Sequence, residues 1–280
     1  MLWSSLAAFT AAAGPVPPFQ LTALSFGIAF LATLGVWAVQ GRLRVQRFAL
    51  PGPAWLLGVG GLFGYHALYF AALKLAPPAE ASLICYLWPL LIVLGSTLVT
   101  RTRLHGWHVA GALMGLGGTA LLIGPSGFSG AHAAGYGVAL LAAFTWAGYS
   151  ILSRRLAHVP SDAVGAFVGA TALLAGLAHL ALAQFGLEAW TSPGPAGWAA
   201  IMALGLGPVG LAFFVWDHGV KHGDVALLGA LSYGAPLLST LILVTLGTAP
   251  ATPTLAAACL LIVGGAALAS RDMLRAGLRR

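Results

Sequence analysis

Residues 78–101 read PAEASLICYLWPLLIVLGSTLVTR, and the motif at their centre returns 147 positions later in residues 224–246, DVALLGALSYGAPLLSTLILVTL. The motif is a tyrosine followed three residues later by a proline, YLWP in the first stretch and YGAP in the second. Both stretches are apolar and reach the ~20 residues that an α-helix needs to cross a bilayer. The tyrosine adds a hydroxyl near the middle of each stretch, and the proline lacks a backbone N–H. The two stretches therefore predict two related membrane helices and the position of a working site.

The composition of the whole chain points to the same class of protein. Of the 280 residues, 59% are hydrophobic and only 7% are charged, and the mean hydropathy is +0.93. A soluble domain of this size could not cover so much apolar surface. The hydrophobic residues recur in about ten runs of roughly 18 to 24 residues, each close to one bilayer thickness. We therefore expect an all-α polytopic membrane protein with ten transmembrane helices.

Turn residues and charges place the boundaries of the ten spans. The first span is too short to cross alone, since about 20 residues are needed, and we expect residues to be missing ahead of it. The two cysteines, Cys85 and Cys259, lie inside apolar runs and form no disulfide framework. The expected spans are residues 1–13, 19–39, 53–73, 78–101, 106–124, 133–152, 162–184, 196–220, 224–246 and 253–270.

The positive charges alternate between the two sides of these spans. In a soluble chain a net charge of +7 would suggest nucleic acid, but here twelve of the thirteen Lys and Arg residues lie after spans 2, 4, 6 and 8 or in the tail. Lys74 alone lies on the opposite side. The positive-inside rule therefore predicts that both termini are cytoplasmic. We expect the bilayer as a partner and no nucleic acid.

The tyrosine-proline motif belongs to a longer internal repeat. Over the later spans of each half the offset is 147 residues, and over the earlier spans it is 143 residues, so the register changes by four residues within spans 3 and 8. The aligned pairs are Tyr69 with Trp216, Lys74 with Lys221, Tyr86 with Tyr233, Pro89 with Pro236, Trp3 with Trp146, and Trp55 with Trp198.

The repeat divides the chain into two halves of five spans each. An odd number of helices per half forces the halves into opposite orientations in the membrane, and inverted repeats of this kind are typical of secondary transporters. We expect inverted repeats at residues 1–125 and 133–270, arranged around a central cavity, and a basic cytoplasmic tail at 271–280.

At this level of detail the chain resembles the drug/metabolite transporter superfamily, with its paired EamA domains. The resemblance covers essentially the whole chain. It rests on MLWSSLAAFT in span 1, GPVPPFQLTALSF before span 2, ALYFAALKLAPPAEASLICYLWPLL across spans 3 and 4, and the glycine-rich spans 5 and 10. Within the superfamily the chain is similar to the YddG type, exporters of aromatic and other neutral amino acids in the bacterial inner membrane. The resemblance implies a cavity lined by spans 1, 3, 4, 6, 8 and 9.

Aromatic residues within the spans are the candidates for lining this cavity. Tryptophans at span ends fit the aromatic belts of membrane interfaces, whereas a buried phenol or indole needs a hydrogen-bond partner. Prolines within spans free backbone carbonyls and bend helices; these are Pro89, Pro208 and Pro236. The expected substrate-binding residues are Tyr65, His66, Tyr69, Tyr86, Trp88, Trp146, Trp216 and Tyr233.

Few ionisable residues lie within the spans, and this limits both the net charge of a substrate that could bind there and the ions that could drive transport. Asp217 lies near the inner end of span 8, where it can pair with Lys221, and no deep acidic residue stands ready to carry a proton. We therefore expect weak or no ion coupling, a neutral or zwitterionic solute such as an amino acid, no metal and no cofactor. The exact solute, the oligomeric state and the preferred conformation remain open.

Three other functions are compatible with parts of the sequence. The aromatic cavity would also accept a flat cationic drug through cation–π contacts. A channel would need a selectivity ring or filter loop, which the sequence does not contain. The pattern Gly127-Phe128-Ser129-Gly130, with His132 nearby, resembles that of an intramembrane serine protease, but it falls in a short outer loop. We therefore expect a transporter that exports its solute by alternating access, and no enzyme.

Glycines spaced four residues apart predict close helix packing. The pairs are Gly60 with Gly64, Gly111 with Gly115, and Gly165 with Gly169. Small residues at this spacing share one face of a helix and allow a neighbouring backbone to approach.

Overall fold

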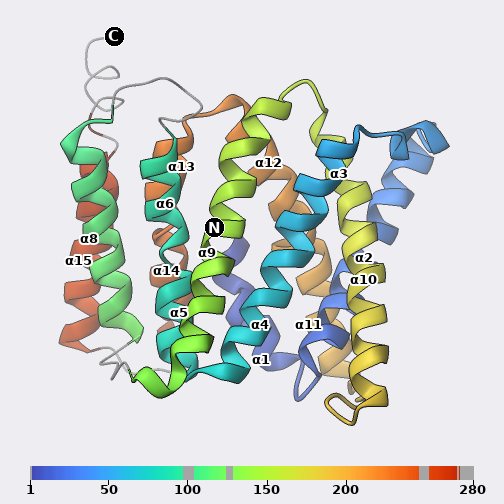
Figure 1. The fold of residues 1–280 in the computed structure, drawn as a ribbon, viewed down its shortest axis with the longest axis horizontal. Helices are drawn as coiled ribbons and strands as arrows, with labels where there is room; N and C mark the ends of the chain where they lie inside the picture. Colours follow the sequence, from blue (N-terminus) through green and yellow to red (C-terminus); the bar gives the residue numbers. More distant parts are fainter. Residues whose placement is uncertain (1, 97–103, 124–128, 246–251, 270, 272–280) are drawn as a thin grey trace. The chain divides into compact units, whose positions relative to one another are not determined.

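The computed structural model of the protein describes residues 2–96, 104–123, 129–245, 252–269 and 271. Within these ranges every regular element is a helix (Figure 1).

Ten apolar helical segments occupy the described part of the chain. Five are long and apolar enough to cross a membrane, four more are apolar but shorter, and α8 (Gly106–Ile123) is the tenth. Each falls on one predicted span, which confirms the all-α polytopic fold with ten transmembrane helices. The long segments are Pro18–Val39, Gly52–Leu75, Gly130–Leu156, Ser161–Gln184 and Pro195–His222, and the shorter ones are Leu2–Ala12, Glu80–Gly95, Val225–Leu238 and Pro253–Ala269.

Helix ends follow the local sequence. The helices α2 (Pro18–Val39) and α15 (Pro253–Ala269) both begin at a proline, whose missing N–H would be unpaired there in any case. After α2 the chain turns at Gly41, with φ of 64°, and after α10 (Val164–Gln184) it turns at Gly186, with φ of 68°. Glycine is favoured there because a Cβ would clash in the left-handed conformation that ends many helices.

Span 4 consists of two helices and not one. The helix α5 (Pro78–Cys85) ends before a turn at Tyr86 and Leu87, and α6 (Trp88–Gly95) begins directly after it. Pro89 lies in the first turn of α6. A proline is tolerated in that position because the first turn has no internal partner for its N–H groups. The interruption therefore places Tyr86 at the junction of two half-helices.

Span 9 repeats this interruption. The helix α13 (Val225–Leu231) ends before a turn at Ser232 and Tyr233, and α14 (Gly234–Thr245) follows with Pro236 as its third residue. Tyr233 thus lies at the same place in span 9 as its repeat partner does in span 4.

Span 3 is continuous but contains a short π-helix. The helix α3 (Gly52–Val59) leads into a π segment (Gly60–Gly64), and α4 (Tyr65–Leu75) continues the span. A π segment inside an α-helix shifts the hydrogen-bond register and is frequent at functional sites.

Span 8 has the same construction. The helix α11 (Pro195–Leu206) precedes a π segment (Gly207–Leu211) that contains Pro208, and α12 (Ala212–His222) follows. The two π segments are 147 residues apart. The helix α11 has 12 residues and α3 has 8, so the four-residue change of register lies in the first helix of these two spans.

By their contacts, the residues of the chain form two compact units. We call residues 2–67 with 156–218 the N-terminal unit, and residues 68–155 with 219–280 the C-terminal unit. The boundaries fall inside α4 and α12, so each unit takes segments from both sequence halves.

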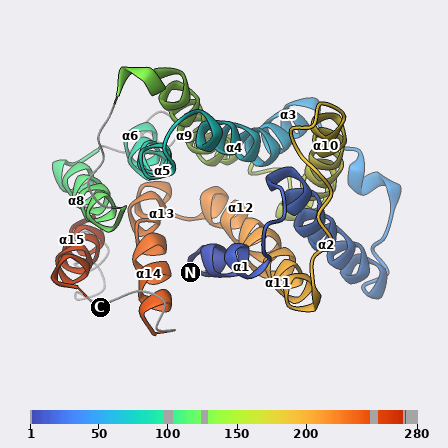
Figure 2. The same ribbon diagram turned by 90° about the horizontal axis from the view of Figure 1, so that it is seen from below.

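In the N-terminal unit, α2 and α10 lie side by side (Figure 2). Gly165 on α10 faces Thr33 and Trp37 of α2, and a Cβ there would lie 2.6 Å from the Thr33 side chain. Gly169 faces Phe30 in the same way. This glycine pair therefore allows the close packing that its spacing predicts.

In the C-terminal unit, α8 and α15 lie side by side (Figure 1). A Cβ on Gly111 would lie 2.5 Å from the carbonyl oxygen of Gly265, and one on Gly115 would lie 2.5 Å from the ring of Tyr233. The second predicted glycine pair is thus also a packing pair. The prediction is wrong for Gly60, where a Cβ would have no atom within 4 Å, because that glycine lies in the π segment of span 3.

Replacing Gly111 with alanine should destabilise the C-terminal unit by about 1–3 kcal/mol, because the added methyl group meets a backbone atom that cannot rotate away. The matched control is Gly117→Ala on the same helix, where a Cβ meets nothing within 4 Å; it should be neutral or slightly stabilising. Thermal unfolding of the purified variants in detergent measures the difference. Equal melting temperatures for the two variants would contradict the proposed contact.

Candidate substrate-binding site

The predicted site residues are distributed over both units. Tyr65, His66 and Trp216 belong to the N-terminal unit, and the other five belong to the C-terminal unit. The structure brings the first three together with rings that the sequence analysis did not select. We call this set the N-terminal aromatic cluster: Trp3, Phe26, Tyr65, His66, Phe213 and Trp216.

Trp3 connects span 1 to span 8 within this cluster. It lies in a short 3₁₀ turn (Leu2–Ser5) ahead of α1 (Leu6–Ala12). Its ring centroid is 5.0 Å from that of Trp216 and 5.9 Å from that of Phe213. Its indole Nε1–H donates a hydrogen bond of 2.9 Å to the carbonyl oxygen of Pro208, in the π segment. The Trp3 side chain therefore gives a hydrogen-bond partner to a backbone carbonyl in the irregular part of span 8. Such a carbonyl needs a partner in the interior of a membrane protein.

His66 lies at the centre of the same cluster. Its ring packs edge-on against Phe26, with centroids 5.2 Å apart, and against Tyr65, with centroids 5.5 Å apart. Its Nδ1 is 2.7 Å from the carbonyl oxygen of Leu62. Because a carbonyl oxygen only accepts, Nδ1 carries the proton and donates this bond. The imidazole is thus fixed in orientation among apolar rings.

The C-terminal unit holds a second set of rings. Trp88 and Trp146 meet edge-to-face, with centroids 6.2 Å apart and planes at 84°, and Trp146 also packs on Tyr149 at 5.2 Å. Such tilted arrangements are favourable for aromatic pairs. Trp88 and Trp146 are 7% and 3% exposed, respectively. They join α6 to α9 (Ala133–Ser153).

Tyr69 and Tyr86 lie near each other in the same unit. The side chains of Tyr69 and Ser82 are hydrogen-bonded, and Tyr69 and Tyr86 are close enough to interact electrostatically. Both tyrosines are half-buried. They combine hydroxyls with apolar rings, which suits the recognition of an amphiphilic solute.

Tyr233 is placed differently from its repeat partner. It is 0% exposed and packs against Gly115 in a hydrophobic cluster that includes Val93, Ala112 and Leu237. In this conformation it fills the contact between span 9 and α8. Its contact with solute stays a prediction.

The sequence analysis omitted five rings that contact the predicted ones: Trp3, Phe26, Phe70, Tyr149 and Phe213. The repeat could have identified Trp3, because it aligns with the predicted Trp146. Tyr149 lies one helical turn after Trp146, a spacing that puts two side chains on one face. For Phe26 and Phe213 the sequence offers no such signal.

The serine of the protease-like pattern and the buried cysteine make contacts that stabilise the fold. Ser129, from the protease-like pattern, accepts a hydrogen bond of 3.3 Å from the backbone N–H of Ala131 and caps a 3₁₀ turn (Gly130–His132). Gly127 and Phe128 lie outside the described residues. Cys85 is buried, and its thiol contacts the carbonyl oxygen of Ala139. In the described ranges no three His, Cys, Asp or Glu side chains are grouped as metal ligands would be.

Ten apolar helices, interrupted or distorted at matched positions in spans 3, 4, 8 and 9 and lined there by aromatic side chains, define a secondary membrane transporter. The chain belongs to the EamA-like transporter family, whose sequence model matches residues 1–124 and 133–271. It is a multi-pass membrane protein and not an enzyme.

Individual relatives support this assignment along the whole chain. The aromatic amino acid exporter YddG of Ancylobacter novellus is 51% identical over 274 residues, which cover 96% of this chain and 93% of the relative. The aromatic amino acid exporter YddG of Escherichia coli K12 is 25% identical over 221 residues, which cover 73% of this chain and 69% of the relative. A solved crystal structure matches with a TM-score of 0.90 at 51% identity, again over 96% and 93% of the two chains.

Proposed function

We propose that the protein exports aromatic and other neutral amino acids across the bacterial inner membrane, by alternating access and with weak or no ion coupling, and that both termini are cytoplasmic. The observation that carries this proposal is the 51% identity, over nearly the full length of both chains, to a relative named an aromatic amino acid exporter. The two sets of aromatic residues support it independently.

The chemistry of these residues suits an aromatic zwitterion. Rings offer stacking partners for an indole or phenyl group, and the hydroxyls of Tyr65, Tyr69 and Tyr86 offer hydrogen bonds to its ammonium or carboxylate. An aromatic amino acid, the solute class in the name of the 51% identical relative, is a zwitterion without net charge, and these rings and hydroxyls suit it better than a phosphate ester.

The irregular parts of the spans support alternating access. The π segments of spans 3 and 8 and the turns at Tyr86 and Tyr233 are places where a helix can bend without breaking regular hydrogen bonds. Because they occur at equivalent positions of the repeat, bending at one set could open one side while the other set closes.

The buried carboxylates bear on ion coupling. Glu80 and Glu188 are each 7% exposed, and Asp217 is 1% exposed. Glu80 accepts a hydrogen bond from the Tyr136 hydroxyl, and Glu188 is paired with His179. We propose that these carboxylates hold the structure together and that none of them carries a proton through the transport cycle.

Counterflow of labelled tryptophan, phenylalanine, methionine and threonine into proteoliposomes of the purified protein, with and without a proton gradient, tests the proposal. We expect saturable uptake at the same rate in both conditions. Uptake that rises with the gradient and loses this response in Asp217→Asn would refute the uncoupled mechanism and identify Asp217 as the coupling group. Absence of uptake of all four amino acids, together with displacement of bound ethidium by other flat cations, would replace the proposal with a cation exporter.

A further inference from the structure

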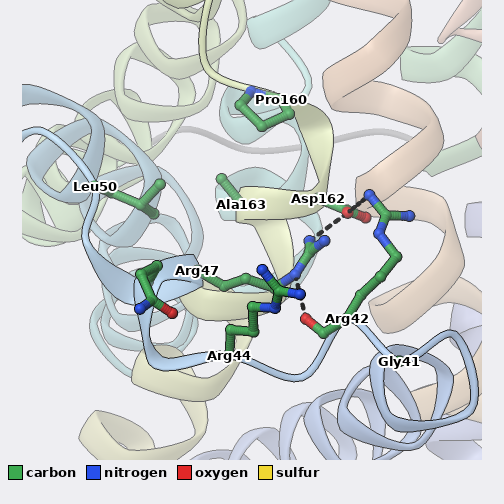
Figure 3. A pocket seen from close by; sticks show the side chains of 9 residues that line it. Gly41, Arg42, Arg44, Arg47, Leu50, Pro160, Asp162 and Ala163 are labelled. Atoms are coloured by element: carbon green, nitrogen blue, oxygen red, sulfur yellow. Dashed lines mark hydrogen bonds and ion pairs between the residues drawn. The ribbon is translucent and has the colours of Figure 1, made fainter.

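A pocket lies at the end of span 2, and none of the rings of the N-terminal aromatic cluster lines it. Its volume is about 610 Å³, and its walls come from the connection that follows α2 and from residues 160–163 at the start of span 7 (Figure 3). Three arginines line it: Arg42, Arg44 and Arg47. All parts of the pocket belong to the N-terminal unit.

The arginines are only partly neutralised. Arg42 and Arg47 converge on the same carboxylate oxygen, Oδ2 of Asp162, at 3.1 Å and 2.5 Å (Figure 3). Arg44 has no ion-pair partner among the described residues and is exposed. Three guanidinium groups therefore share one carboxylate, which leaves the pocket with an excess of two positive charges.

The surrounding structure fixes the position of Arg47. The guanidinium of Arg47 lies over the ring of Trp37 at 4.9 Å, and its Nε donates a hydrogen bond of 2.8 Å to the carbonyl oxygen of Arg42. Trp37 is itself only 2% exposed. Arg47 is thereby held on Asp162, while the planar guanidinium groups of Arg42 and Arg44 match the oxygens of a phosphate.

Exposed apolar side chains stand next to the arginines of the pocket in the chain. Val39, at the last residue of α2, is 91% exposed, and Leu43 and Val45 are 53% and 83% exposed. Apolar residues that alternate with arginines at the end of a transmembrane helix match the headgroup region of a bilayer, where acyl chains and phosphates meet. A site built only for a free phosphate would not need these apolar side chains.

We propose that the pocket binds the phosphate headgroup of an anionic phospholipid in the leaflet that faces this end of α2. The phosphate diester would bind Arg44 and the exposed face of Arg42, and the acyl chains would lie along Val39 and the apolar side chains beside it. Arg47 would stay on Asp162. The lipid would thereby join the connection after span 2 to the start of span 7.

The test compares wild-type protein with Arg44→Gln in nanodiscs of phosphatidylcholine alone and of phosphatidylcholine with phosphatidylglycerol. Bound phosphatidylglycerol is counted by native mass spectrometry, and the melting temperature is followed in parallel. We expect phosphatidylglycerol to raise the wild-type melting temperature and to bind about tenfold less tightly to Arg44→Gln, because this variant loses a charge-assisted hydrogen bond to the phosphate. Arg44→Lys, which keeps the charge, should retain most of the binding.

The matched control is Arg155→Gln, which removes one positive charge from another exposed site. It should bind phosphatidylglycerol as the wild type does. Equal losses in Arg44→Gln and Arg155→Gln would overturn the site in favour of a diffuse surface charge effect. A melting-temperature rise produced equally by inorganic phosphate in detergent would overturn the lipid and leave a site for a free anion.

Discussion

Replacement of Tyr86 by alanine should slow amino-acid export about tenfold while the amount of folded protein stays the same. The side chain lies at the junction between α5 and α6 and is half-buried, close to Tyr69. Loss of a stacking aromatic ring and its hydroxyl removes roughly 1–1.5 kcal/mol of interaction with the solute, which is close to a factor of ten in affinity. Initial rates of counterflow at low substrate concentration measure the effect.

Tyr233, the repeat partner of Tyr86, should respond differently to replacement by alanine. Tyr233 is fully buried against Gly115, so Tyr233→Ala should lower the free energy of unfolding by about 3–5 kcal/mol, as a large cavity in a core does. Tyr86→Phe separates the ring from the hydroxyl and should keep most of the export. Wild-type export by Tyr86→Ala would show that this tyrosine does not contact the solute.

Glu188→Leu should clearly lower the stability of the N-terminal unit. Glu188 lies in the connection after α10; its Oε2 is 2.7 Å from Nδ1 of His179, and its Oε1 accepts a hydrogen bond from the backbone N–H of Phe19. The side chains of Glu188 and His179 are 2% and 6% exposed. Removing one partner of a buried polar pair leaves the other unsatisfied, and we expect a cost of about 3 kcal/mol.

The melting temperature of the purified protein in detergent tests this, with a double variant as the control. In His179→Leu/Glu188→Leu both polar groups are gone, so the double variant should be more stable than the sum of the two single changes predicts. Additive losses, or a melting temperature of Glu188→Leu equal to that of the wild type, would show that the pair contributes nothing to stability.

The sequence predicted the fold class well because the membrane imposes simple rules. Span length follows from bilayer thickness, and the described helices fall on the ten predicted runs. The interruptions of spans 4 and 9 were harder to predict. Pro89 and Pro236 signalled an irregularity, but hydropathy is continuous through both spans, and only the backbone shows that each helix stops before the tyrosine and starts again with the proline in its first turn.

The ring contacts were predictable in part, while the binding of solute by these residues stays a prediction. The eight selected residues were chosen from their positions within spans. Five of them lie in the two aromatic sets of the structure, Tyr69 and Tyr86 lie near each other in the C-terminal unit, and Tyr233 lies in a packing contact. Phe26 and Phe213 could not be found, because their contact joins residues far apart in the chain and depends on helix packing. The sequence did not predict the arginine pocket for the same reason, because Asp162 is 115 residues from Arg47. The arginines alone indicated only on which side of the membrane their connection lies.

The two π segments also set the rotational phase of spans 3 and 8. An α-helix advances by about 100° per residue, and a π turn absorbs one extra residue, so the residues after it keep the faces they would have in an α-helix one residue shorter. A deletion of one residue between Gly60 and Gly64 would therefore restore regular α geometry and leave Tyr65, His66 and Tyr69 on their present faces, but it would remove the irregular turn at which span 3 can bend. Because span 8 would keep its own π segment, such a deletion would make the two halves of the transport cycle unequal in energy and bias the protein toward opening on one side.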